Sequence, residues 1–590
     1  MATTKKKKGN RIKYYAAKAV RGDDEIMVAA GDVETDGLGG RLLMVQWGFM
    51  GQVFYSSSET MVQEFFDFAS QLPQPVIWYF HFGQYDWRYF LDYFIDNEIE
   101  IDIGMRSDVD IYQIKFKGVG GKWCIMRDSY ALWPSPLEKL ADAFCPEIPK
   151  MKIDIENFNP HDPEHIKYAK RDIEILLTGM PRLFDMMYQH FGINAGATTA
   201  GTALKAWQKS LGKDEIYDCS TWNSQEAFIR QAYYGGLVFL TSTEMVNNAE
   251  TYDINSSYPD SMERYGVPFG RAIATTDFQN GKMGIYRCRV KAPDDLIVPI
   301  IPARNEKGGM RWYKGEFDTV CTSVELIFAA KHGYEILEVY EGIFFEETIF
   351  PFSDFIWHCK MIRSEFKGLS QEALAKLMQN SLYGKYGARR ERTRMMSAYS
   401  MDEDDFIDST PYDDAGNWYL SKEFDDEMNC QPAWAVFITA HSRIKLLNTV
   451  YKIGAENVLY GDTDSITVRE GFGHLVDQGL EYGQWKKEKV WRKFRAIAPK
   501  VYAGILEDGT FTGAAKGLPR KGITDKNWNE LLEDGESQAT TLSLPSLRVA
   551  MKKGVSAATE LTRVSSSLNN SSNYIAMQGG AVRVKYKHEK

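Results

Sequence analysis

Short apolar runs closed by turn residues recur along this chain, and longer stretches with helical periodicity separate them. The runs VIWYF at 76–80 and NVLY at 457–460 have the length and composition of buried strands. In residues 163–177, apolar side chains instead recur every three or four positions, which is typical of a helix with one buried face. Because 590 residues exceed what one hydrophobic core organises, the pattern predicts an α/β and α+β protein of several domains.

Acidic residues stand at the ends of strand patterns in the C-terminal two-thirds of the chain. In YGDTDSI at 460–466, two strand-like runs flank a short turn, which predicts a β-hairpin with Asp462 and Asp464 at its tip. Asp253 ends another strand pattern, and a helix is predicted to begin near Tyr258. Carboxylates this close repel one another unless a cation lies between them, although a solvated turn rich in Asp is the simpler interpretation. Two such strands could present Asp253 and Asp464 to the same pair of Mg²⁺ ions.

A helix with a mixed polar face is predicted for residues 370–387, with Ser370 as its N-cap and Gly384 as its terminator. One face carries the side chains of Lys376, Asn380 and Tyr383. An ordinary solvated face is one interpretation. The other is a nucleoside triphosphate site, because lysine binds phosphate and tyrosine stacks near a base.

Carboxylates also mark three elements of the N-terminal third. Asp32 and Glu34 lie two apart in a predicted strand at 26–37, so they share one face. A helix is predicted over 161–177, with Asp162 as cap and Pro163 in its first turn, and it places Tyr168 beside Asp172. The full acidic set is Asp32, Glu34, Asp86 and Asp172. These residues suit two divalent cations and a water that attacks a phosphodiester.

Charge is sorted along the chain, so the net charge of −10 excludes little. Residues 484–500 contain seven Lys or Arg, whereas residues 401–430 contain eleven Asp or Glu against Lys422 alone. Basic segments can face phosphate while acidic segments face away. The basic start of the chain predicts a solvated tail, or alternatively a tail that contacts nucleic acid.

The cysteines and the hydropathy indicate the compartment. None of the seven cysteines forms a C-x-x-C pair, so neither a structural zinc site nor a disulfide framework is expected. A reducing cytoplasm is the expected location. No apolar run reaches 18 residues, so no transmembrane helix is expected.

Taken together, the motifs resemble those of family B DNA polymerases. YDINSSYP at 252–259, KLMQNSLYGKYG at 376–387 and YGDTDSI at 460–466 are similar to the three polymerase motifs, in the family's order. KVY at 500–502 and QAYYGG at 231–236 are similar to its Lys-x-Tyr and Tyr-x-Gly-Gly motifs. The N-terminal carboxylate segments resemble the three exonuclease motifs of proofreading members.

The resemblance implies polymerase roles for individual residues. Asp253, Asp464 and the main-chain carbonyl of Ile254 would bind two Mg²⁺ ions, for which Mn²⁺ can substitute, and Asp462 would be an accessory acid. Tyr258 would exclude a ribose 2′-hydroxyl, Lys376 would hold the triphosphate, and Asn380 and Tyr383 would line the nucleotide pocket. DNA contacts are implied for Lys500, Tyr502, Tyr233, Gly235, Gly236 and Lys516.

For the exonuclease, the resemblance implies that Asp32, Glu34, Asp86 and Asp172 bind a second pair of metal ions and that Tyr168 orients the water or the phosphate. A catalytic lysine is expected before the third motif, with Lys152 as the choice and Lys150 as the alternative. His81 and Ser129 would contact single-stranded DNA. The chain departs from the family at Phe82, where Asn is usual, and at Tyr130, where Leu is expected. Phe82 can stack on a base but cannot hydrogen-bond a frayed primer end.

The implied architecture is a ribonuclease-H-like 3′–5′ exonuclease domain joined to a right-hand polymerase. Its ranges are a basic tail (1–25), the exonuclease (26–194), the palm (195–265 and 431–520), a first insertion (266–350), the fingers (351–387), an acidic second insertion (388–430) and the thumb (521–590).

The first insertion carries the resemblance to protein-primed polymerases of phages and linear plasmids. In that group the insertion docks a terminal protein that supplies the priming hydroxyl. The implied partners are therefore template and primer DNA, dNTPs and a terminal protein, with no membrane, for a monomeric enzyme. The alternatives are a DNA-primed or primer-independent enzyme, or a relative that binds DNA but has lost catalysis.

Overall fold

The computed structural model describes residues 27–72, 76–107, 110–118, 121–211, 220–402, 405–406, 409–424, 430–515, 523–526, 528–529, 538–553, 562–567, 574–576 and 582–584. The predicted basic tail, Lys516 and much of the predicted thumb lie outside these ranges. In the described part of the chain, no helix has both the length and the apolar character to cross a lipid bilayer.

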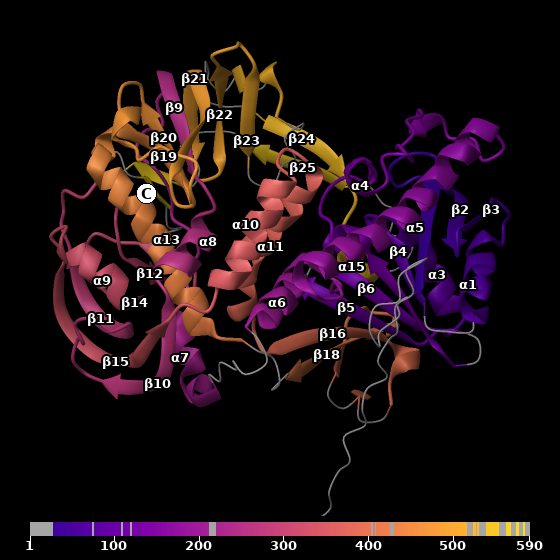
Figure 1. The fold of residues 1–590 in the computed structure, drawn as a ribbon, viewed down its shortest axis with the longest axis horizontal. Coiled ribbons are helices and arrows are strands. Elements are labelled where there is room, and N and C mark those ends of the chain that lie inside the picture. Colours follow the sequence, from indigo (N-terminus) through magenta and orange to yellow (C-terminus); the bar gives the residue numbers. More distant parts are fainter. Residues whose placement is uncertain are drawn as a thin grey trace, which may run out of the picture.

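A large mixed sheet organises the N-terminal third and lies at the right of Figure 1. Its order is β17 (Ser409–Pro411), β18 (Trp418–Phe424), β16 (Glu391–Ser397), β5 (Ile101–Ser107), β6 (Asp110–Lys117), β7 (Trp123–Asp128), β4 (Val76–Phe80), β1 (Met27–Thr35), β2 (Leu42–Phe49) and β3 (Gln52–Ser56). β4 is parallel to both β1 and β7. Three strands of the predicted second insertion thus extend the sheet that carries the N-terminal acids.

Helix α5 (Pro163–Phe191) packs on this sheet and brings Asp172 close to the acids of β1. It begins as predicted, because the Asp162 carboxylate accepts the Glu164 N–H at 2.8 Å and Pro163 occupies the first turn. It continues beyond the predicted end at residue 177 and stops at Gly192, whose φ is +63°. Gly48 of β2 allows the close approach, because a Cβ there would lie 2.4 Å from Ile173. Shorter helices complete this part: α1 (Met61–Gln71), α2 (Gly83–Asp86), α3 (Leu91–Asp96) and α4 (Leu137–Phe144).

A second, antiparallel sheet holds the C-terminal acids and lies at the upper left of Figure 1. Its order is β23 (Phe511–Ala515), β22 (Val501–Leu506), β21 (Trp485–Ala498), β9 (Val246–Ile254), β20 (Ser465–Arg469), β19 (Val458–Asp462) and β8 (Val238–Leu240). Helices α8 (Ser257–Arg264) and α13 (Pro432–Ile453) contact each other beside it. Its strands come from both sequence ranges predicted as palm.

Residues 267–349 form a separate antiparallel sheet. Its order is β10 (Val267–Thr275), β15 (Glu335–Ile349), β11 (Gly284–Ala292) and β14 (Gly315–Thr322). The same residues also form a two-stranded ribbon, β12 (Pro302–Arg304) with β13 (Met310–Trp312), and helix α9 (Ser323–Ala330). It is fastened to the second sheet's helix α13 by a fully buried ion pair, Arg443 to Glu325 at 2.7 Å. Such a pair is costly to break, because either partner alone would be an uncompensated buried charge.

Helices α6 (Thr199–Ser210), α7 (Glu226–Gln231), α10 (Ser353–Glu365) and α11 (Ser370–Tyr386) connect the sheets. α6, α10 and α11 run through the centre of Figure 1. The predicted cap and terminator of α11 were wrong. Leu369 is the N-cap, Gly384 lies within the helix, and Gly387 ends it. Short elements lie further along the chain: β24 (Gln538–Ser543), α15 (Leu547–Lys553), β25 (Thr562–Ser567), β26 (Tyr574–Ala576) and β27 (Val582–Val584).

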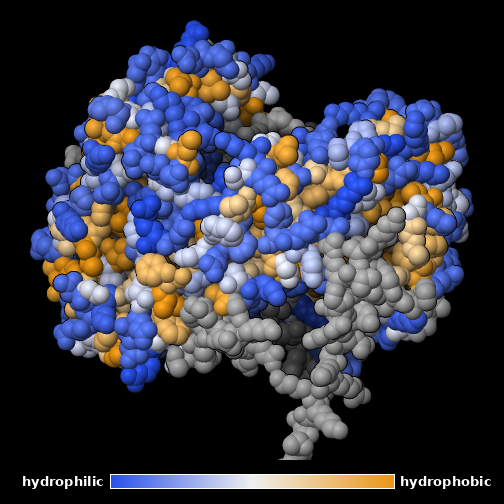
Figure 2. Space-filling model, in the orientation of Figure 1, coloured by the Kyte–Doolittle hydropathy of each residue, from blue (hydrophilic) through white to orange (hydrophobic). Residues whose placement is uncertain are grey.

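Polar side chains dominate the face in Figure 2, and apolar residues appear there only as scattered patches. The large apolar side chains are instead buried. One cluster packs against one face of the N-terminal sheet, and another lies between the second sheet and residues 286–334. A third cluster is continuous from the other face of the N-terminal sheet through α5, α6, α10 and α11 to α13, so apolar packing joins the N-terminal sheet to the connecting helices.

Candidate active sites

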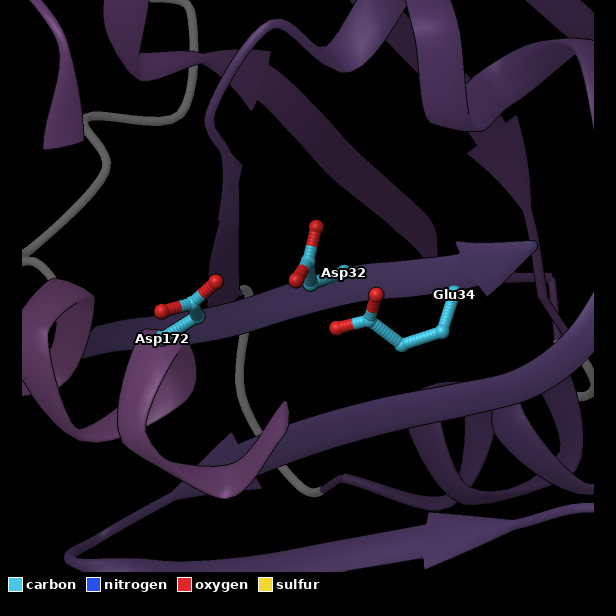
Figure 3. A group of neighbouring side chains, drawn as sticks. All are labelled: Asp32, Glu34 and Asp172. Atoms are coloured by element: carbon cyan, nitrogen blue, oxygen red, sulfur yellow. The ribbon is translucent and has the colours of Figure 1, made fainter. Parts of the chain in front are cut away.

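Three N-terminal carboxylates meet where α5 crosses β1. Oxygens of Asp32, Glu34 and Asp172 all lie within 4.8 Å of one another, and Figure 3 shows the three groups converging. The alternation of a strand brings Asp32 and Glu34 to one face, as predicted, and the first turns of α5 bring Asp172. Burial, followed by the charge of Asp172, raises the pKa of Asp32 to about 7.

Asp86 approaches the same cluster from α2. It is buried, and its pKa is raised well above the ordinary value, first by burial and then by the charges of Asp32 and other acids. Asp86 Oδ2 and Asp172 Oδ1 accept no hydrogen bond from the described residues. Buried, unsatisfied carboxylate oxygens facing like charges fit divalent cations, which would remove both penalties.

The lysine beside these acids is Lys150, the alternative of the two candidates, whereas Lys152, the first choice, lies away from them. Lys150 donates to Asp172 Oδ2 and lies 4.1 Å from the centroid of the Tyr168 ring. Lys152 pairs with Glu138 at the surface, and its side chain is 78% exposed. Tyr168 is buried beside Asp172, as the helical spacing predicts.

The segments that follow the parallel strands β4 and β7 hold the residues implied to contact single-stranded DNA. His81 Nδ1 lies 2.9 Å from Ser129 Oγ, and burial lowers the pKa of His81 to about 4, so its ring is neutral at pH 7. Phe82 has φ +62°, is 48% exposed, and stacks on Tyr130 with ring centroids 4.0 Å apart. One oxygen of Asp128 accepts the backbone N–H groups of both Phe82 and Tyr130. The two departures from the family pattern therefore form one stacked pair, in which Phe82 is exposed and Tyr130 is partly buried.

The C-terminal acids meet at the middle of the second sheet. β19 and β20 form the predicted hairpin, with Thr463 and Asp464 at its turn. Asp253 on β9 lies opposite Ser465, and the Ile254 N–H donates to the Asp464 carbonyl at 2.7 Å. Asp253 and Asp464 therefore lie on hydrogen-bonded neighbouring segments, close enough to affect each other's ionisation.

The ionisation of these acids reflects that proximity. Burial, then the charge of Asp464, raises the pKa of Asp253 to about 7. Burial, then the charge of Asp462, raises the pKa of Asp464 to about 6. The positive charge of Lys376 on α11 acts on both and favours their ionised forms, whereas Glu488 at a bulge of β21 opposes ionisation. Two close carboxylates with raised pKa values fit a divalent cation site.

Asp462, the third acid of this hairpin region, is bound by a lysine. Lys500, whose φ is +63°, donates to both of its oxygens at 2.9 and 3.0 Å. The Tyr460 hydroxyl also donates to Asp462, at 3.3 Å, and accepts the Lys500 N–H at 3.0 Å. Lys500 therefore lies close to the acids, as the motif order implies, but it is paired with the accessory acid.

Tyrosine rings line the space between α8 and α11. Tyr258 stacks on Tyr383 with centroids 4.1 Å apart, and Asn380 lies half-buried one turn earlier on α11.

Two further tyrosines belong to the predicted DNA contacts. Tyr233 contacts the end of α11, since a Cβ at Gly387 would lie 2.6 Å from its ring. Tyr502 lies on β22, with its ring 5.3 Å from that of Tyr460.

The Tyr-x-Gly-Gly segment passes directly under the hairpin tip. A Cβ at Gly236 would lie 2.5 Å from Thr463 Oγ1, so glycine permits the contact. Arg443 fixes this segment by donating to the carbonyls of Tyr234 and Gly235 at 2.7 and 2.9 Å.

Sequence reasoning missed three residues at these sites: Gln46, Arg443 and Glu488. Each lies in a strand or helix, where a single polar residue is usually a solvated surface position. For Gln46 the available signal was a glutamine inside the apolar run LLMVQWGF, whereas the runs around Arg443 and Glu488 contain other polar residues and gave no such signal.

Comparison with known proteins gives a consistent result. The chain matches the family described as DNA polymerase type B, organellar and viral, over residues 72–165 and 160–424. A relative from Neurospora intermedia named "Probable DNA polymerase" is 30% identical over 374 residues, which are 58% of this chain and 38% of that protein. The DNA polymerase of Bacillus phage M2 is 27% identical over 440 residues, which are 69% of this chain and 72% of the relative.

Solved structures show the same fold. Phi29 DNA polymerase, in its ternary complex with primer-template DNA and incoming nucleotides, superposes with a TM-score of 0.71 at 18% identity, covering 92% of this chain and 100% of that one. Its binary complex with primer-template DNA gives a TM-score of 0.67 at 20% identity, covering 85% and 95%. The predicted multidomain α/β and α+β fold is confirmed.

Proposed function

This chain belongs to the organellar and viral type B DNA polymerases, and on that premise we propose that it extends primers on a DNA template at one site and trims their 3′ ends at another. The observation that carries the proposal is the presence of two separate carboxylate clusters, each with pKa values raised by burial and by like charge. A single cluster would support one phosphodiester reaction, whereas two on different sheets support synthesis and degradation.

At the palm site, Asp253, Asp464 and the Ile254 carbonyl would bind Mg²⁺, for which Mn²⁺ can substitute. Bound there, the ions would activate the primer 3′-hydroxyl and stabilise the leaving pyrophosphate. Lys376 would neutralise the triphosphate, a role supported by the effect of its charge on both acids. Tyr258, braced by Tyr383, would stand where the sugar enters and exclude a 2′-hydroxyl.

The primer strand would approach along the basic strand β21 and the residues after it. Lys500 and Tyr502 would hold the primer. Lys500 would first have to leave its ion pair with Asp462, after which its ammonium group could bind a primer phosphate. Tyr233, Gly235 and Gly236 would guide the template past the hairpin.

At the nuclease site, Asp32, Glu34, Asp86 and Asp172 would bind a second pair of divalent cations, which would activate a water for attack on the phosphodiester. Lys150 and Tyr168 lie beside Asp172, where they can orient that water or the phosphate. His81 and Ser129 would hold the single strand, while Phe82 and Tyr130 would stack on its bases.

Primer extension tests the polymerase assignment. Asp464→Asn removes one charge at the acid pair and is expected to abolish dNTP incorporation. Asp477→Asn is the matched control, because Asp477 is an exposed acid in the same part of the chain. Equal extension by wild type and Asp464→Asn would refute the metal assignment.

Degradation of a single-stranded primer tests the nuclease. Asp32→Ala combined with Glu34→Ala is expected to stop degradation while synthesis continues. Continued degradation would place the nuclease acids elsewhere.

Initiation on a terminal protein is the finer proposal, supported by the inserted sheet at residues 267–349 and by phage relatives, and it would take place in the host cytoplasm. Incubation with dATP, Mg²⁺ and a terminal protein from the same genome is expected to give a protein–nucleotide adduct. Normal extension of a DNA primer without any adduct would favour DNA-primed or primer-independent initiation.

A further inference from the structure

A buried glutamine lies beside the nuclease carboxylates, on the strand next to theirs. Gln46 is at the middle of β2, is 0% exposed, and is the cross-strand partner of Asp32. Its neighbours Val45 and Trp47 are apolar and buried. An amide in such a strand costs free energy unless its polar atoms are paired, so its presence calls for a partner.

The partners of Gln46 are two of the proposed metal ligands. Its Nε2 donates to Asp32 Oδ2 at 2.9 Å and to Glu34 Oε1 at 3.1 Å. Both hydrogens of one amide therefore hold one oxygen from each of two carboxylates that repel each other. The carbonyl oxygen of the same amide is buried and accepts no hydrogen bond from the described residues.

We propose that Gln46 is a positioning residue of the nuclease, holding Asp32 and Glu34 in the arrangement that binds a divalent cation. The inference rests on the nuclease function proposed above. Hydrogen bonds from a second layer of residues fix the orientation of metal-binding carboxylates. An amide suits this position because it donates to both acids and adds no charge.

Other side chains of similar size would fail for different reasons. Leucine or methionine at position 46 would leave Asp32 and Glu34 without their shared donor. Glutamate would add a further negative charge beside Asp32 and Glu34, whose pKa values are already raised by burial and then by like charge.

Cation affinity is the property that separates positioning from mere structural support. The experiment uses the full chain carrying Asp253→Asn and Asp464→Asn, so that Mn²⁺ binding reports on the nuclease site. Mn²⁺ is titrated and the free ion is measured by electron paramagnetic resonance. Gln46→Leu is expected to weaken Mn²⁺ binding about 10- to 100-fold, the range seen when residues behind metal ligands are removed.

Gln113→Leu is the matched control, because Gln113 is a buried glutamine on β6 of the same sheet that accepts from Arg127. It is expected to keep the parental Mn²⁺ affinity even if it lowers the melting temperature. Gln46→Met is measured in parallel, since its unbranched side chain fits a similar volume should the leucine variant not fold.

Parental Mn²⁺ affinity in a folded Gln46 variant would overturn the inference. Failure of the wild-type chain to degrade single-stranded DNA at any Mn²⁺ concentration would instead overturn the proposed nuclease. The two failures are distinguishable, because one is read from ion binding and the other from product.

Discussion

Asp253 and Asp464 are partly buried and repel each other, and a bound divalent cation would relieve that repulsion. Burial and mutual repulsion raise their pKa values to about 7 and about 6. Without metal, the folded chain binds protons at these carboxyls more tightly than the unfolded chain does. The free energy of unfolding therefore falls as pH rises from the ordinary value of 3.8 towards about 7.

Asp253→Asn should remove much of the fall in the free energy of unfolding between pH 4 and pH 8, because asparagine carries no charge to be penalised. In EDTA, we expect the variant to melt at a higher temperature than wild type at pH 8, with the difference vanishing near pH 4. Melting temperatures measured from pH 4 to 8, with and without Mg²⁺, provide the check. A difference independent of pH would contradict the assignment of the raised pKa to Asp253.

The Phe82 ring should contribute to single-strand binding by stacking. It is exposed, stacked on Tyr130, and held in a left-handed backbone conformation that is rare for aromatic residues. Loss of one base–aromatic stack costs about 1–3 kcal/mol, so Phe82→Ala should raise KM for single-stranded DNA roughly 5- to 150-fold. Trp123→Ala is the control, since Trp123 is 40% exposed at the far end of β7. An unchanged KM would remove the stacking role.

At the nuclease site, the sequence predicted which acids and which tyrosine lie together, but not which lysine lies beside them. Asp32 and Glu34 share a face because strands alternate, and Tyr168 neighbours Asp172 because helices repeat. The two candidate lysines lie outside any periodic element, so only the observed path of that segment separates them.

At the scale of elements, periodicity predicted where helices and strands lie better than where they end. Ser370 and Gly384 looked like the limits of α11, yet the helix ends at Gly387. A Cβ at Gly384 would contact nothing within 4 Å, so glycine is tolerated there but not required by packing. At Gly387 the Tyr233 ring leaves no room, a contact between distant segments that local sequence does not reveal.

These two glycines form a matched pair for a stability test. Gly384→Ala should raise the free energy of unfolding by about 0.4–1 kcal/mol, because alanine restricts the unfolded chain and fits the helix. Gly387→Ala should lower it, because the new Cβ would lie 2.6 Å from Tyr233. Urea unfolding of both variants is the measurement, and destabilisation of equal size at both positions would contradict the packing argument.

At the scale of the molecule, the acidic second insertion connects the two halves. β16 begins five residues after α11 ends, and it pairs with β5 at Met395–Ile103 and Met396–Asp102. Arg394 adds an ion pair to Asp102 at 2.9 Å. The sequence revealed the acidity of this insertion but not its pairing, because the register is set by a strand nearly 300 residues earlier.

Two serines fasten this junction. Ser397 Oγ donates to the Ile99 carbonyl at 2.9 Å, and Ser400 Oγ donates to the Ile101 carbonyl at 2.7 Å. Both hydroxyls also accept the Ile101 N–H. The first residue of β5, Ile101, is therefore held by side chains that follow α11 in the sequence.

Replacing both serines by alanine should loosen the junction without touching either acid cluster. A buried donor or acceptor left unpaired costs about 1–3 kcal/mol, so the Ile101 amide should lose protection and exchange hydrogen roughly 5- to 150-fold faster. Ser409→Ala is the control, because the Ser409 hydroxyl on β17 has no hydrogen-bond partner among the described residues. Hydrogen exchange of a peptide spanning residues 97–107 is the measurement. Unchanged exchange in the double variant would mean that strand pairing alone holds the insertion to the nuclease sheet.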